Sequence, residues 1–159
     1  MEDITMIALG SDHAGLPLKK EIMAMLEEMG LAYRDYGTYT AGSCDYAAYA
    51  QRAAKAVVSG ECDRGILCCG TGVGISLAAN KVRGIRCACV SDCYSAKMTR
   101  KHNDANMLAM GARVVGADLG RMIAEIFLTT EFEGGRHQRR VDQIMAIEAG
   151  EDLTTGLEP

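Results

Sequence analysis

The stretch Arg64-Gly-Ile-Leu-Cys-Cys-Gly-Thr-Gly-Val-Gly74 joins an apolar run directly to a cluster of glycines. Residues 64–69 are apolar at their centre, which is typical of a parallel strand covered on both faces. A helical pattern follows the glycines and continues to about Lys81. A strand, a glycine turn and a helix form the repeating unit of α/β proteins, so this stretch predicts a parallel sheet covered by helices.

The rest of the chain repeats this alternation of strands and helices. Apolar runs predict strands at residues 6–10, 31–36, 86–91 and 107–112. Helical periodicity predicts helices at residues 16–29, 46–59, 92–102, 119–128 and 137–149, with Asp118 as the N-cap of the fourth. The order predicts an α/β fold, a Rossmann-like three-layer sandwich with a five-stranded parallel sheet.

Length and composition indicate how many domains the chain forms, which partners are excluded and which compartment it occupies. With 159 residues and 48% hydrophobic content, residues 1–149 are predicted to form one domain, and the acidic tail 150–159 to be mobile or to pack on a partner subunit. The net charge of −4 argues against nucleic-acid or membrane-surface partners. Neither a signal peptide nor a membrane span is predicted, and the seven cysteines, an odd number, indicate a reducing compartment such as the cytoplasm.

The cysteines do not predict a metal site. No C-x-x-C occurs, and Cys87-x-Cys89 places two thiols on one face of a strand without a second pair of ligands.

The glycine turn predicts an anion site. Backbone N–H groups between a strand and a helix lack helical partners and converge on one point. A dinucleotide-binding turn is the rival interpretation, and Asp92 superficially supports it. That motif requires glycine at position 75, where this chain has Ile75.

Cys69 is the candidate base because it stands immediately before these amides, which would stabilise a thiolate. Cys68 faces the other side of the strand, since adjacent strand residues alternate. We expect Cys68, Cys87 and Cys89 to be buried and inert.

Other candidates also follow strands. Asp12 and His13 come after the first strand, and Arg113 after the fifth. Arg136 and Arg140 share one face at the start of the last helix, which suits a phosphate, although the stretch could equally be a solvated basic surface.

Several segments together resemble type B ribose-5-phosphate isomerases, within the ribose and galactose phosphate isomerases. They are Gly10-Ser-Asp-His-Ala-Gly15, Cys69-Gly-Thr-Gly-Val-Gly-Ile-Ser76, Ala79-Asn-Lys81, Gly84-Ile-Arg86, His102-Asn-Asp-Ala-Asn106 and Gly134-Gly-Arg-His-Gln138. The resemblance covers residues 5–149 in a consistent order. It implies interconversion of ribose 5-phosphate and ribulose 5-phosphate through a cis-enediolate, a reaction of the pentose phosphate pathway.

The resemblance also implies residue roles. Cys69 takes the C2 proton beside Thr71, and the amides of Gly70, Gly72, Val73 and Gly74 hold the enediolate. Asp12 and His102 take part in opening the furanose ring, and Asn103 and Tyr46 contact the sugar. The phosphate contacts are His13, Arg113, Arg136 and Arg140.

The resemblance further implies a homodimer, or a dimer of dimers, with sites across the subunit interface and with no metal or organic cofactor. Two alternatives remain open. One is an isomerase of the same family acting on galactose 6-phosphate, allose 6-phosphate or a tetrose phosphate. The other is a non-catalytic sugar-phosphate-binding module in which Cys69 is structural.

Overall fold

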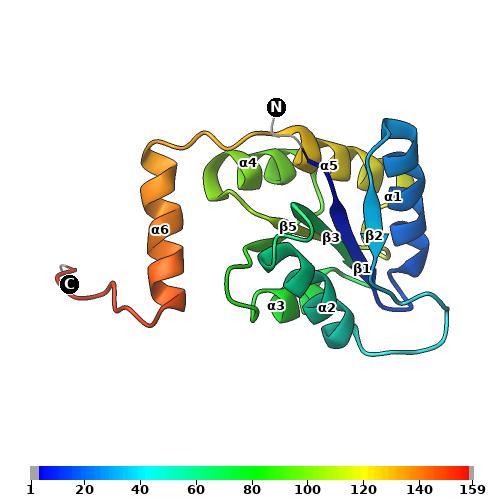
Figure 1. Ribbon diagram of the computed structural model, residues 1–159, viewed down its shortest axis with the longest axis horizontal. Coiled ribbons are helices and arrows are strands. Elements are labelled where there is room, and N and C mark those ends of the chain that lie inside the picture. Colours follow the sequence, from blue (N-terminus) through cyan, green and yellow to red (C-terminus); the bar gives the residue numbers. More distant parts are fainter. Residues whose placement is uncertain (1–3, 158–159) are drawn as a thin grey trace.

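The computed structural model describes residues 4–157 and contains a five-stranded parallel sheet between layers of helices (Figure 1). The elements in chain order are β1 (Ile7–Ser11), α1 (Leu16–Met29), β2 (Tyr33–Asp35), α2 (Tyr46–Val58), β3 (Arg64–Cys69), α3 (Val73–Ala79), β4 (Cys87–Cys89), α4 (Cys93–Asn103), β5 (Met107–Gly111), α5 (Ala117–Thr129) and α6 (Arg136–Glu148). The strand order is β2-β1-β3-β5-β4, with parallel neighbours. The predicted fold class is confirmed.

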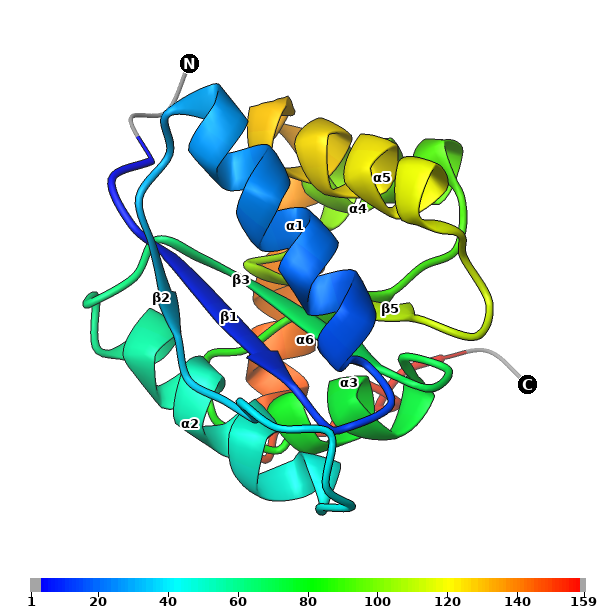
Figure 2. The same ribbon diagram turned by 90° about the vertical axis from the view of Figure 1, so that its right-hand side faces the viewer.

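Helices cover both faces of the sheet (Figure 2). On one face, α1, α4 and α5 pack against Leu9, Ile66, Leu108 and their neighbours. On the other face, α2 and α3 pack against Leu67, Ala109 and the side chains beside them. Because both faces are covered, every residue of the central strands β1 and β5 is buried. This explains why these strands are apolar runs rather than alternating ones.

The helix α1 has the predicted bounds. Pro17 lies in its first turn, and Gly30 ends it in the left-handed region with φ 70°. At its start, a Cβ on Gly15 would lie 2.1 Å from the Cys68 carbonyl oxygen, so only glycine allows this approach. The close contact brings the turn that carries Asp12 and His13 to the end of β3.

The structure corrects some predicted boundaries. Strands β2 and β4 are only three residues long each, because both are edge strands that pair on one side. Asp118 does not cap α5. Gly116 is the N-cap, and Asp118 lies in the first turn, where a carboxylate interacts favourably with the helix dipole.

The last helix, α6, stands apart from the other elements at one end of the molecule (Figure 1). Its buried residues are His137 and Val141. It packs against α4, and its Glu148 accepts a hydrogen bond from the Gly84 N–H. Ile144 and Ile147 remain 45% and 60% exposed. Residues 151–157 are exposed, and the last two residues of the predicted tail lie outside the described residues.

Among residues 4–157, none of the helices combines the length and the apolar character that crossing a membrane would require.

Candidate active site

Cys69 is the last residue of β3 and is 3% exposed. Its Sγ accepts a hydrogen bond from the Gly72 N–H at 3.0 Å. Its carbonyl oxygen accepts from the Ala112 N–H at 2.8 Å, which ties the end of β3 to the segment after β5. The thiol is therefore held under the glycine turn, at the carboxyl edge of the sheet.

The turn from Gly70 to Gly74 needs glycine at position 72. Gly72 has φ 82°, and a Cβ there would lie 2.8 Å from the Met110 carbonyl carbon. One amide of the turn, that of Val73, donates to Thr71 Oγ1 at 3.3 Å. Within residues 4–157, the N–H groups of Thr71 and Gly74 donate to no protein acceptor. The turn thus presents donors beside the Cys69 sulfur.

The other thiols differ from Cys69 in their surroundings. Burial raises the pKa of Cys68 to about 12, and Cys68 belongs to the core on the opposite face of the sheet, as predicted. Burial also raises the pKa of Cys87. The expectation for Cys89 is wrong. It is exposed at the last position of the edge strand β4, and its Sγ lies 3.9 Å from the Thr71 carbonyl oxygen.

Asp12 and His13 lie at the end of the neighbouring strand β1. Asp12 is 7% exposed, and its Oδ1 accepts from the Gly15 N–H at 2.9 Å. His13 Nδ1 accepts from the Cys44 N–H at 3.2 Å. This bond places the proton of a neutral His13 on Nε2, where it can be donated to a ligand.

Arg113 and Tyr46 complete this edge. The Arg113 N–H donates to the Gly70 carbonyl oxygen at 3.0 Å, and a Cβ on Gly70 would lie 3.4 Å from Arg113 Nη1. Tyr46, at the start of α2, packs its ring on Gly74, where a Cβ would lie 2.6 Å from Cζ. We name these residues the carboxyl-edge group: Asp12, His13, Tyr46, Cys69, Gly70, Thr71, Gly72, Val73, Gly74 and Arg113.

The remaining predicted residues form a second group at the other end of the sheet. His102 lies in the last turn of α4 and stacks on His137 of α6, with ring centroids 4.2 Å apart. Glu133 Oε2 lies 3.9 Å from His102 Nε2 and 3.5 Å from His137 Nε2. Burial, and after it the positive charge of His102 and Arg136, lowers the pKa of His137.

Arg136 and Arg140 are exposed on the first turns of α6, as predicted, and Asn103 is exposed beside His102. We name His102, Asn103, Arg136 and Arg140 the amino-edge group. Cys69 pairs with Gly111, the last residue of β5, whereas His102 precedes the first residue of β5. At about 3.3 Å per residue, β5 alone separates the two groups by roughly 15 Å.

Comparison with known proteins identifies the family. The Ribose/Galactose Isomerase family model matches residues 7–144. The chain belongs to this family. Ribose-5-phosphate isomerase B of Escherichia coli is 54% identical over 142 residues, covering 89% of this chain and 95% of that protein. D-erythrulose-4-phosphate isomerase of Pectobacterium atrosepticum is 43% identical, covering 87% of this chain and 91% of that protein.

A solved structure of ribose-5-phosphate isomerase B from Clostridium thermocellum superposes with a TM-score of 0.91 at 52% identity. The match covers 92% of this chain and 99% of that one. The fold of the ribose/galactose isomerase family therefore extends over nearly the whole described chain.

In this family member, one cluster offers metal-ligand atoms among the described residues: His102, Glu133 and His137. The two imidazole rings are nearly parallel, at 10°, so their in-plane lone pairs do not converge on one point. Lys101 Nζ already pairs with Glu133 Oε1 at 2.7 Å, and Arg136 and Arg140 add positive charge. These surroundings favour an anion over a metal cation.

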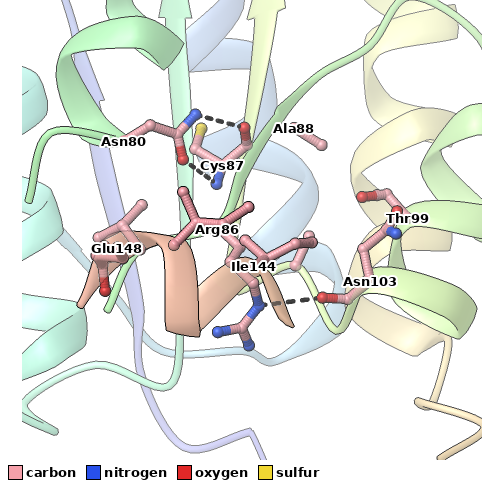
Figure 3. A pocket seen from close by; sticks show the side chains of 11 residues that line it. Asn80, Arg86, Cys87, Ala88, Thr99, Asn103, Ile144 and Glu148 are labelled. Atoms are coloured by element: carbon pink, nitrogen blue, oxygen red, sulfur yellow. Dashed lines mark hydrogen bonds between the residues drawn. The ribbon is translucent and has the colours of Figure 1, made fainter. Parts of the chain in front are cut away.

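A cleft of about 470 Å³ lies between α6 and the edge strand β4, lined by Asn80, Cys87, Thr99, Ile144 and others (Figure 3). Its charged members are already engaged. Arg86 donates to the Asn103 and Asp104 carbonyl oxygens, and Glu148 accepts from the Gly84 N–H. The residues that line the cleft include Asn103 of the amino-edge group and none of the carboxyl-edge group.

Sequence reasoning did not single out Glu133 and His137 as neighbours of His102. The i,i+4 spacing of Glu133 and His137 is visible in the chain, but nothing in the sequence connects them with His102. That connection depends on how α6 packs against α4.

Proposed function

We propose that this chain is an aldose–ketose isomerase that interconverts ribose 5-phosphate and ribulose 5-phosphate, with Cys69 as the base. The observation that carries the proposal is the Cys69 sulfur, 3.0 Å from the Gly72 N–H and beside further amides of the same turn. Its family and its 54% identity to ribose-5-phosphate isomerase B of Escherichia coli support the substrate.

The proposed chemistry needs a base and a cage for negative charge. The Cys69 thiolate takes the C2 proton, and charge develops on the carbonyl oxygen at C1. Amides of residues 70–74, beside Thr71, stabilise this enediolate. Returning the proton to C1, with a proton moved from the C2 hydroxyl to O1, gives the ketose. Only protons move, so we propose that no metal or organic cofactor takes part.

The proposed phosphate and ring-opening contacts require a second subunit. His13 and Arg113 belong to the carboxyl-edge group, whereas Arg136, Arg140, His102 and Asn103 belong to the amino-edge group. A single chain keeps these groups on opposite edges of the sheet. We therefore propose a homodimer in which the amino-edge group of one chain completes the carboxyl-edge group of its partner.

The proposed site then divides the work between the two chains. Asp12 and the partner's ring-opening imidazole, His102, flank the furanose ring, with Tyr46 and Asn103 as sugar contacts. Arginines from both chains hold the phosphate and keep the enediolate in place. The free thiols and the family suit a cytoplasmic enzyme.

The test of the substrate is turnover by the purified protein on four compounds: ribose 5-phosphate, allose 6-phosphate, galactose 6-phosphate and erythrose 4-phosphate. We expect the highest kcat/KM on ribose 5-phosphate. Turnover of none of them would contradict the enzymatic proposal and favour a sugar-phosphate-binding module.

A tetrose phosphate is the second candidate substrate. The relative named D-erythrulose-4-phosphate isomerase, at 43% identity, favours it. A higher kcat/KM on erythrose 4-phosphate than on ribose 5-phosphate would move the proposal to this substrate and leave the proposed mechanism unchanged.

The shared site is tested by mixing two inactive variants, Cys69→Ala and His102→Asn, after exchange of subunits. In a mixed dimer one site has both residues and the other has neither. After random exchange about half of the dimers are mixed, and each has one intact site of two. The mixture should therefore show about a quarter of the activity of the same amount of wild-type protein. If the mixture stays as inactive as its components, the two groups do not act across an interface.

A further inference from the structure

Lys19 is a charged side chain in the interior, only 1% exposed. Its ammonium donates to Asp35 Oδ1 at 2.7 Å and to the Thr38 carbonyl oxygen at 2.5 Å. A buried amine is costly unless it is paired and hydrogen-bonded in this way. The proposed proton transfers and phosphate contacts do not use Lys19, so its role lies elsewhere.

The partners of Lys19 form a turn against the end of β1. Asp35 Oδ1 also accepts from the Gly37 N–H at 2.9 Å. The Ser11 N–H donates to the Gly37 carbonyl oxygen, and the Thr38 N–H donates to the Ser11 carbonyl oxygen, each at 2.7 Å. Lys19 therefore holds a turn whose backbone is hydrogen-bonded to Ser11, the residue that immediately precedes Asp12 and His13.

The segment 39–45 that follows this turn contains no helix or strand, and its residues 39–43 are exposed. It returns to the carboxyl-edge group at Cys44, whose N–H donates to His13 Nδ1. Tyr46 comes next and packs on Gly74. Because the segment has no regular structure of its own, its position depends on the anchors at its two ends.

We infer that Lys19 is a positioning residue of the isomerase site, which acts by holding the turn at residues 35–38 and, through it, the segment that contacts His13 and carries Tyr46. The inference rests on the proposed function, since it concerns the placement of two proposed substrate contacts.

The double variant Lys19→Met/Asp35→Asn tests this role. It removes both charges, so no unpaired buried charge remains, and the amide oxygen in Asp35→Asn still accepts from the Gly37 N–H. The link from position 19 to Thr38 is lost. We expect KM for ribose 5-phosphate to rise about tenfold or more with kcat within about threefold, because substrate contacts move while the base does not. Amide hydrogen exchange should quicken about tenfold at Gly37, Thr38 and Cys44, whose N–H groups are hydrogen-bonded, with β3 and β5 unchanged.

Lys20→Met is the matched control, because Lys20 is the next residue of α1 and is exposed. It should change neither KM nor exchange. Wild-type KM and wild-type exchange in the double variant would overturn the inference. Failure of the double variant to fold would also overturn it, since the pair would then be needed for the fold rather than for the segment. If the unchanged protein turns over no sugar phosphate, the proposed function fails, while exchange at the same three amides still decides whether Lys19 holds the segment.

Discussion

The carboxyl-edge group and the amino-edge group differ in how their surroundings hold them. Cys69 is 3% exposed at the end of a central strand, and backbone hydrogen bonds fix the turn beside it. Arg136 and Arg140 are exposed on a helix that packs mainly through His137 and Val141. The difference indicates that the rigid sheet edge suits proton transfer, which depends on position, while the exposed arginines suit capture of an anion.

Removing the proposed base should produce the largest effect. We expect Cys69→Ala to lower kcat by about 10²–10⁴-fold, the range for loss of a general base. The dissociation constant of a non-reacting phosphate ligand should stay within about threefold of wild type, because the proposed phosphate contacts are elsewhere. Steady-state kinetics and calorimetric binding give the two values.

Cys68→Ala is the matched control for this experiment. Cys68 faces the opposite core, and burial keeps its thiol protonated, with the pKa raised to about 12. We expect the variant to keep its activity while losing some stability through a small cavity. Full activity in Cys69→Ala, or its loss in Cys68→Ala, would remove Cys69 from the role of base.

Truncating the arginines of the amino-edge group should have a smaller effect, seen in binding. We expect Arg136→Ala and Arg140→Ala each to raise KM by about 10–100-fold, since a charge-assisted hydrogen bond is worth about 1.5–3 kcal/mol. The melting temperature should hardly change, because both side chains are exposed.

Arg139→Ala is the matched control, as Arg139 is an exposed arginine on the same turn of α6. It should leave KM near the wild-type value. Equal effects in all three variants would show that general positive charge matters rather than two specific contacts.

The smallest expected effect is a pH dependence confined to the amino edge. Burial, aided by His102 and Arg136 and opposed by Glu133, lowers the pKa of His137 from 6.5. Protonation of His137 therefore favours states in which this side chain has left its buried position. The stabilising contribution is fully present above pH 6.5 and is lost as the pH falls below that value.

Hydrogen exchange in α6, corrected for its intrinsic pH dependence, measures this effect. Protection of α6 should decrease from about pH 7.5 to about pH 5.5, while β1, β3 and β5 keep theirs. His137→Asn should remove the difference between the two pH values. Equal loss of protection in the central strands would mean that the effect is global.

Local patterns in the chain were sufficient to predict most of the fold. The bounds of α1 and β3 match the prediction because apolar periodicity, Pro17 and Gly30 act locally. The assignment of Cys68 and Cys69 to opposite faces follows from strand alternation and is confirmed. The predicted N-cap of α5 and the predicted burial of Cys89 were wrong, since loop geometry and the position of a strand in the sheet depend on distant neighbours.

The sequence by itself determined which segments form strands and helices, and which residues follow each strand. Periodicity and glycine turns are properties of neighbouring residues, so they can be read from the chain. Only the tertiary structure decided which of those residues meet. It placed His102 on His137 and away from Cys69, and it buried Lys19 beneath the turn at Thr38. These contacts join segments far apart in the chain, so they arise from packing of helices against the sheet and leave no local pattern in the sequence.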